Sequence, residues 1–120
     1  MILLDSDHVS VLRLKPGNLR RDHIVARLAL AAADQVVAIP VVVTEETMCG
    51  WLSALAKERK SQRQVFAYRE LADMFQFFAR WPIITFDAAA ADIFDQYNHS
   101  RLGTRDRKIA AIAIANNALR

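Results

Sequence analysis

The sequence has little of what several classes of protein need. Of its 120 residues only one is cysteine, Cys49, so an intrachain disulfide is excluded and we expect a reducing, cytoplasmic location. The three glycines stand apart, which excludes a glycine-rich phosphate-binding loop. The apolar runs fall far short of the roughly 20 residues that cross a bilayer, and Asp5 interrupts the first of them too early for a signal peptide. We therefore expect a soluble protein with no membrane partner.

The composition indicates one ordinary globular domain. Hydrophobic residues make up 53% of the chain and charged residues 24%, which is too apolar for a disordered tail and too charged for a membrane bundle. The net charge of +3 is compatible with an anionic partner but does not require one. No internal repeat or change in composition divides the sequence, so we expect a single domain over residues 1–120.

Short apolar runs alternate with longer helical patterns. Strands are expected at residues 2–4, 36–39 and 82–86, with residues 41–43 as a continuation of the second strand beyond Pro40. Helices are expected at residues 8–14, 19–33 and 62–80, and also from Thr44, from Asp87 to about Gln96, and from Thr104. Strands without polar alternation are usually buried on both faces, as in a parallel sheet. The pattern predicts an α/β, three-layer domain with a central parallel sheet flanked by helices.

Acidic residues stand where the predicted strands end and the helices begin. Asp5 follows the first strand, Glu45 and Glu46 follow the second in the first turn of a helix, and Asp106 lies in the first turn of the last helix. Right-handed crossovers bring the carboxyl ends of parallel strands to one edge, where open α/β sheets bind ligands. Singly, each acid also fits a helix cap or a first-turn acid, and Asp87 fits the role of a cap best.

The chemistry of such a cluster points to a hard cation. Converging carboxylates repel one another unless a cation neutralises them, and ligand sets made only of oxygen suit Mg²⁺ or Mn²⁺. Such an ion can activate water and stabilise charge on a phosphodiester during cleavage. A zinc site is not indicated, because His8, His23 and His99 are scattered and Cys49 stands alone.

Three segments resemble the motifs of PIN-domain ribonucleases, especially the VapC-type toxins of bacterial toxin–antitoxin pairs. Residues 2–10 are similar to the first motif, residues 42–46 followed by 50–52 to the second, and residues 103–113 to the third. The resemblance spans essentially the whole chain. It implies a PIN-like fold, a Mg²⁺-dependent endoribonuclease activity, homodimerisation, and a hydrophobic groove for a cognate antitoxin protein.

The resemblance also assigns individual residues. Asp5 and Asp106 match the first and third acids and would be metal ligands. The second acid of the family precedes a glycine by four residues, which selects Glu46 over Glu45 and makes Asp5, Glu46 and Asp106 the expected catalytic residues. Thr104 matches a small polar position that supports the site, and Asp7 one that orders the first turn. Apart from the resemblance, their position beside Asp106 makes three basic residues the expected contacts to the RNA backbone, with salt bridges to nearby acids as the alternative: Arg105, Arg107 and Lys108.

One departure keeps other functions open. The family continues past its last helix into another strand with a fourth acid nearby, and this chain is expected to lack both. The alternative is therefore a catalytically impaired PIN-fold module that binds antitoxin or RNA without cleavage. A receiver-like signalling domain also gathers acids around Mg²⁺, with Asp87 as its phospho-acceptor, but the lysine that should end a later strand is missing.

Overall fold

Three short parallel strands, in the order β1–β2–β3, form the centre of the part of the chain that the structure describes. The structure is a computed structural model that describes residues 1–97 and 101–118. Strand β1 (Ile2–Leu3) pairs with β2 (Val37–Pro40), and β2 pairs with β3 (Ile83–Ile84). The register places Leu3 opposite Ala38 in the first pair and Ile39 opposite Ile83 in the second. Strand β2 is therefore the middle strand, and each of its residues is buried.

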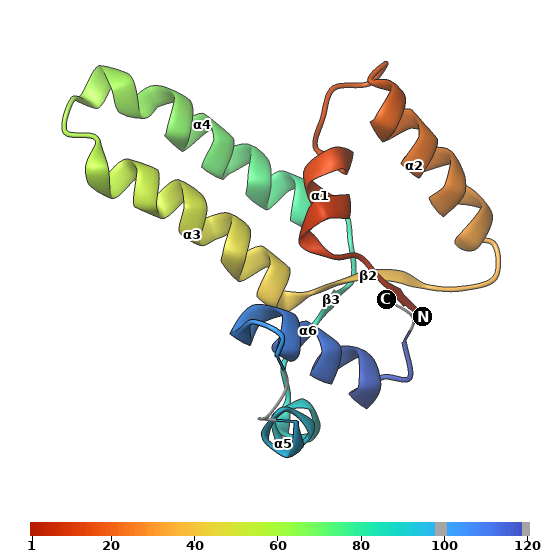
Figure 1. Ribbon diagram of the computed structural model, residues 1–120. Coiled ribbons are helices and arrows are strands. Elements are labelled where there is room, and N and C mark those ends of the chain that lie inside the picture. The colour runs from red at the N-terminus through yellow and green to blue at the C-terminus, as the bar shows by residue number, and fades with distance from the viewer. Residues whose placement is uncertain (98–100, 119–120) are drawn as a thin grey trace.

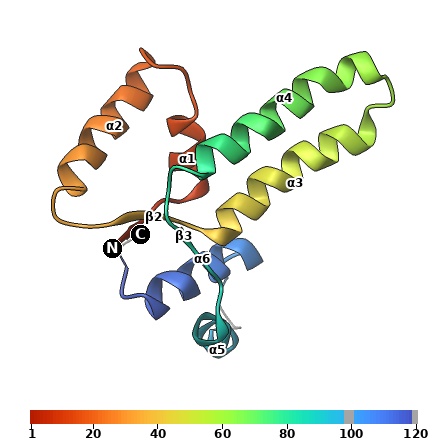
Figure 2. The same cartoon turned by 180° about the vertical axis from the view of Figure 1, so that it is seen from behind.

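The described residues form six helices around this sheet (Figure 1). Helices α1 (Ser6–Leu12), α2 (Leu19–Ala31) and α4 (Ser61–Phe78) lie on one side, and α5 (Ala88–Gln96) and α6 (Thr104–Ala115) lie on the other. Helix α3 (Val41–Lys57) continues directly from β2 and forms a long hairpin with α4 that extends from the rest of the molecule, as the reverse view in Figure 2 also shows. The prediction of an α/β fold with a central parallel sheet flanked by helices is confirmed.

The core connects both helical layers through the middle strand. Ile39 of β2, Val43 of α3 and Ile112 of α6 are fully buried, and Leu3 and Met74 are almost so. A parallel sheet needs apolar cover on both faces, and these side chains supply it. Because α6 packs its buried face into this core, the start of α6 is held at a fixed place relative to β1 and α3.

Truncating the core side of α6 should destabilise the protein. We expect Ile112→Ala to lower the free energy of unfolding by about 2–5 kcal/mol, because Ile112 is fully buried and its loss leaves a cavity. The matched control is Ile114→Ala on the same helix, where the side chain is 52% exposed, and we expect less than about 1 kcal/mol there. Urea unfolding of both variants measures the difference, and equal effects would contradict this description of the core.

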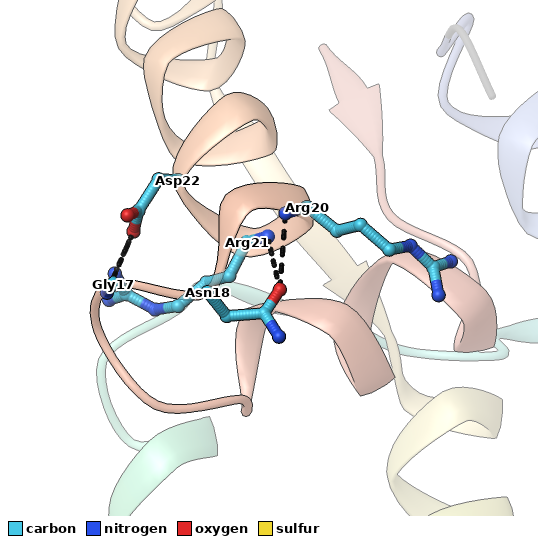
Figure 3. A network of polar contacts seen from close by, with 5 residues as sticks. All are labelled: Gly17, Asn18, Arg20, Arg21 and Asp22. Atoms are coloured by element: carbon cyan, nitrogen blue, oxygen red, sulfur yellow. Dashed lines mark hydrogen bonds and ion pairs between the residues drawn. The ribbon is translucent and has the colours of Figure 1, made fainter.

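The start of α2 is fixed by a small polar network (Figure 3). Asn18 is the N-cap, and its Oδ1 accepts hydrogen bonds from the main-chain N–H groups of Arg20 at 3.1 Å and Arg21 at 3.2 Å. Asp22 accepts a further bond from the Gly17 N–H at 3.4 Å. Gly17 has a φ of 94°, a left-handed conformation that glycine adopts without steric cost. The network sets the direction in which α2 leaves the preceding turn.

The predicted continuation of the second strand over residues 41–43 is wrong, and so is the helix start at Thr44. Helix α3 begins at Val41 with Pro40 as its N-cap, and the Thr44 hydroxyl donates to the Val41 carbonyl inside the helix. Val42 and Val43 are buried, so packing against the core outweighs their preference for strands. The sequence had placed Glu45 and Glu46 in the first turn of this helix. As a result of the earlier start, both residues lie beyond the first turn.

Other helix starts differ by a few residues from the prediction. Helix α1 begins at Ser6 instead of residue 8, with Asp5 as its N-cap, and α4 begins at Ser61 instead of residue 62, whereas α6 begins at Thr104 with Gly103 as its N-cap. The predicted role of Asp87 as the cap of α5 is confirmed, because its Oδ1 accepts from the Ala90 N–H at 2.9 Å. None of the helices in the described part of the chain has the length and apolar character needed to cross a membrane.

Candidate active site

A cavity of about 530 Å³ lies where the chain leaves β1 and where α6 begins. Three segments far apart in the sequence form it: the start of α1, the first half of α3 and the N-terminal end of α6. Its lining contains four carboxylates, and it brings together all three acids that the sequence singled out. The lining residues are Asp5, Ser6, Asp7, Glu46, Gly103, Thr104, Arg105, Asp106 and Ile109.

Asp5 is held in place by the residue three positions further along the chain. Its Oδ1 accepts a hydrogen bond from the main-chain N–H of His8 at 2.9 Å, which makes Asp5 the N-cap of α1. The same oxygen lies 2.7 Å from the Nδ1 of the His8 ring. Two contacts to one oxygen restrict rotation of the carboxylate. Asp5 thus acts as a helix cap and lines the cavity at the same time.

Glu46 reaches the cavity from α3 and is also held by its neighbours. The Ser6 hydroxyl donates to its Oε2, and Nη1 of Arg105 lies 3.9 Å from its Oε1. Ser6 begins α1 and Arg105 lies in the first turn of α6, so Glu46 links all three segments of the site. Because the pair with Arg105 is well exposed to solvent, it orients the side chains more than it stabilises the fold.

Asp106 completes the acidic lining from the first turn of α6. A carboxylate in the first turn of a helix interacts favourably with the positive end of the helix dipole. The neighbouring Thr104 also lines the cavity, in line with the supporting position that the resemblance gives it. The exposed Asp106 carboxylate is therefore both compatible with its helix and accessible from the cavity.

The donor chemistry of the cavity fits a hard divalent cation. Within residues 1–97 and 101–118, no group of three or more His, Cys, Asp or Glu side chains is arranged as it stands to hold a metal ion. Mg²⁺ does not require such a group, because it keeps several of its waters and is usually bound by one or two carboxylates together with substrate oxygens. Asp5 and Asp106 offer two carboxylates in the lining of one cavity, which matches that preference.

Comparison with known protein families identifies the fold family. A model of the PIN domain matches residues 11–119, most of the chain. The chain belongs to the PIN-domain family. The matched range includes Glu46 and Asp106, and Asp5 lies before its first residue. Comparison with curated protein sequences gave no match.

Solved structures extend the similarity to nearly the full chain. A structure of VapBC2 from Rickettsia felis bound to a DNA fragment from their promoter has a TM-score of 0.67 and 25% identity, over 98% of this chain and 84% of that one. FitAB bound to an IR36 DNA fragment has a TM-score of 0.59 and 26% identity, over 98% and 81%. FitAcB from Neisseria gonorrhoeae, with a TM-score of 0.59, 22% identity and coverage of 98% and 84%, shows the fold alone. The predicted likeness to VapC-type PIN proteins is confirmed.

The basic residues of this PIN domain do not all face the acidic cavity. Arg105 lines it. The Arg107 guanidinium lies 4.2 Å from the centre of the Phe94 ring and donates to the Phe94 carbonyl at 3.3 Å, which directs it toward α5. Lys108 lies over the ring of Phe86 with Nζ 5.9 Å from the ring centre, beside a different cavity. The structure therefore brings only the first of the three predicted RNA contacts next to the acids.

Sequence reasoning did not anticipate two contacts in the PIN site. It did not connect Ser6 with Glu46, which are 40 residues apart, or His8 with the carboxylate of Asp5. A signal for the second contact was present, because a side chain three residues after an N-cap lies one helical turn away and faces it. For the contact between Ser6 and Glu46, the sequence offered only one indication, which is that Ser6 directly follows an acidic residue at the end of a strand.

The contact between His8 and Asp5 predicts a change in metal affinity. We expect His8→Ala to weaken Mn²⁺ binding about threefold. Removing the hydrogen-bond partner of a buried metal ligand usually weakens binding about tenfold or more, and the effect is smaller here because the pair of His8 and Asp5 is half exposed. His8→Asn, whose amide nitrogen can replace Nδ1 as a donor, should restore most of the affinity. Titration calorimetry without RNA measures both, with His23→Ala on α2 as the control, and equal affinities in all variants would contradict the expectation.

Proposed function

We propose that this PIN domain is the toxin component of a type II toxin–antitoxin pair and that it hydrolyses RNA phosphodiester bonds with a bound Mg²⁺ ion. The observation that carries the proposal is the single cavity shared by Asp5, Glu46 and Asp106, which come from three distant segments of the chain. Asp5 and Asp106 would hold the ion, and Mn²⁺ is the alternative metal. Family membership supports a nuclease, and the similar VapBC and FitAB complexes support the pairing with an antitoxin.

Both the bound ion and side chains of the protein contribute to cleavage. When bound, the ion supplies a more acidic water and a positive charge that stabilises the phosphodiester in the transition state. Glu46 accepts a proton from the attacking water at Oε1, because Ser6 already donates to Oε2 and the weak contact of Arg105 with Oε1 is given up when Arg105 turns to the RNA. The water oxygen forms a bond to phosphorus as the bond to the leaving ribose oxygen breaks, and that oxygen takes a proton from solvent.

Arg105 is the residue that holds the RNA backbone at the site. It lines the acidic cavity, and its weak ion pair with Glu46 leaves a cation that can turn to a phosphate oxygen. The positive charge of Arg105 also offsets the negative charge of the acids, which would otherwise repel RNA. Arg107 and Lys108 remain predicted contacts to parts of the RNA that lie further from the cleaved bond.

A cleavage assay with the purified protein tests this function. We expect labelled single-stranded RNA to be cut in the presence of Mg²⁺, to remain intact when EDTA is added, and to be cut again when excess Mg²⁺ is restored. RNA that binds but is never cut would favour the alternative of a binding module. Cleavage that continues unchanged in EDTA would contradict the role of the metal.

An apolar groove separate from the acidic cavity supports the antitoxin as a partner. It encloses about 430 Å³ between α1, α2 and the end of α4. The buried Nε of Arg21 has no hydrogen-bond partner in the described part of the chain, so an acceptor on a bound segment would satisfy it. The groove is lined by Leu12, Arg21, Val25, Leu28, Ala29, Ala32, Val37, Phe77, Arg80 and Trp81.

We assign this groove to an apolar segment of the antitoxin that carries a carboxylate or carbonyl oxygen toward Arg21 and Arg80. The predicted homodimer would use a different surface. The hairpin of α3 and α4 carries large apolar side chains that are about half exposed and therefore suited to a second copy of the chain. These side chains are Leu52, Val65, Phe66, Tyr68 and Phe75.

A further inference from the structure

A second cavity lies close to the acidic one and has a different chemistry. It encloses about 240 Å³ and combines an aromatic ring, a lysine and a carboxylate with two valines. Val41 follows β2 and Phe86 follows β3, so this cavity stands at the carboxyl ends of those two strands. The acidic cavity stands at the carboxyl end of β1, along the same edge of the sheet. The lining residues are Val41, Val42, Glu45, Phe86 and Lys108.

We propose that this second cavity binds a base of the RNA strand whose backbone enters the acidic cavity, and that it favours guanine. The inference rests on the proposed RNA-cleaving function and adds a subsite that determines base preference. None of its polar side chains is needed as a metal ligand or as the base that activates water.

Phe86 supplies a fixed aromatic surface for the base. Its ring and that of Phe94 form a T-shaped pair, with ring centres 6.0 Å apart and an angle of 84° between the planes. It is half-buried against the core, which limits its rotation. Proteins recognise unpaired RNA bases chiefly by stacking them on such rings. A ring that is already positioned loses little conformational freedom when a base stacks on it.

Glu45 supplies the preference between bases. Its carboxylate is exposed and lines the same cavity, and an ionised carboxylate only accepts hydrogen bonds. Guanine presents two neighbouring N–H donors on its Watson–Crick edge, one from the ring and one from the amino group, which match the two oxygens of a carboxylate. Uracil presents only one N–H there. A carboxylate at this position therefore favours guanine over uracil.

Lys108 brings a positive charge to the wall of this subsite. Its Nζ lies 5.9 Å from the centre of the Phe86 ring, a distance at which a cation is attracted by an aromatic face. The same amine can reach a phosphate oxygen of the nucleotide whose base stacks on Phe86, and it offsets the charge of Glu45 toward the RNA backbone.

The two cavities are connected through the same pair of helices. On α3, Glu45 lines the second cavity and its neighbour Glu46 lines the acidic one. On α6, Lys108 lines the second cavity and Asp106, two residues earlier, lines the acidic one. One RNA strand that crosses the start of α6 can therefore contact both cavities, with a phosphate at the acids and a base at Phe86.

Binding of short RNAs in EDTA, where cleavage is stopped, tests the subsite. The probes are a fluorescein-labelled uridine hexamer and the same hexamer with one central guanosine, and fluorescence anisotropy gives both dissociation constants. We expect the unmodified protein to bind the guanosine probe about fivefold more tightly. Glu45→Gln should remove this preference and leave the affinity for the uridine hexamer within about twofold, because the substituted amide no longer offers two acceptors.

Variants of the aromatic ring give a second, independent readout. Phe86→Leu should weaken binding of both probes about tenfold, and Phe86→Trp should restore it, since stacking of one base on an aromatic ring contributes about 1–3 kcal/mol. Phe66→Leu, at an exposed ring on α4, is the matched control and should have no effect. Thermal unfolding of each variant shows whether the fold is retained, and Glu45→Gln keeps the test valid should Phe86→Leu unfold.

The outcomes separate this inference from the proposed function. Equal affinity of the unmodified protein for the two probes, or unchanged binding in folded Phe86→Leu, overturns the subsite while Mg²⁺-dependent cleavage still supports a nuclease. Failure of the unmodified protein both to bind and to cut RNA overturns the proposed function together with the subsite.

Discussion

Asp5→Asn is expected to abolish RNA cleavage, with a loss of at least about a thousandfold, while the protein keeps its fold. The substitution removes a negative charge from the proposed metal site, and a loss of about 4 kcal/mol of transition-state stabilisation corresponds to that factor. The cap of α1 should survive, because asparagine is as good an N-cap as aspartate and can still accept from the His8 N–H. Single-turnover cleavage of a labelled RNA and urea unfolding measure the two properties.

The control for this prediction is a second acid of the same cavity. Asp7 lines the cavity two residues after Asp5, so Asp7→Asn makes the same change of charge in nearly the same place. We expect Asp7→Asn to keep cleavage within about tenfold of the unmodified protein. Undiminished cleavage by Asp5→Asn would refute its role as a metal ligand. Equal losses in both variants would show that only the overall charge of the cavity matters.

Val25→Arg is expected to weaken antitoxin binding about a hundredfold. Val25 lines the apolar groove, and a charge placed there would be buried without a partner beside Arg21 and Arg80 when the antitoxin docks. The fold should tolerate the change, because Val25 is 38% exposed and no residue of α2, all of which is described, is buried. Titration calorimetry with the antitoxin of the same gene pair measures the dissociation constant.

The same helix offers a control for the groove. Leu30 is 78% exposed and does not line the groove, so Leu30→Arg adds the same charge outside it. We expect antitoxin binding to this variant to stay within about threefold of the unmodified protein. A full loss of binding in Leu30→Arg, or none in Val25→Arg, would place the antitoxin elsewhere on the molecule.

The convergence of the three acidic side chains on one site could be predicted because it depends on topology alone. Once the strands were expected to be parallel, the strand ends and helix starts that carry Asp5, Glu46 and Asp106 had to face one edge of the sheet. The structure places all three in the lining of one cavity. The choice of Glu46 over Glu45 came from the resemblance, and the structure places the two in different cavities.

The details around the acids could not be predicted, because they depend on packing. Three consecutive β-branched residues after Pro40 favour a strand locally, yet the burial of Val42 and Val43 makes them the start of a helix. Arg107 and Lys108 follow Asp106 directly, but successive side chains on a helix point in directions about 100° apart. They therefore reach Phe94 and Phe86 instead of the acids.

We propose that Asp5 and Asp106 hold one divalent ion, with Glu46 close enough to act on its water. Anomalous diffraction from a crystal soaked in Mn²⁺ tests this directly. We expect one strong peak in the cavity, within direct bonding distance of a carboxylate oxygen of Asp5 and one of Asp106, and separated from Glu46 by a single water. A peak elsewhere on the protein, or none at a saturating Mn²⁺ concentration, would contradict it.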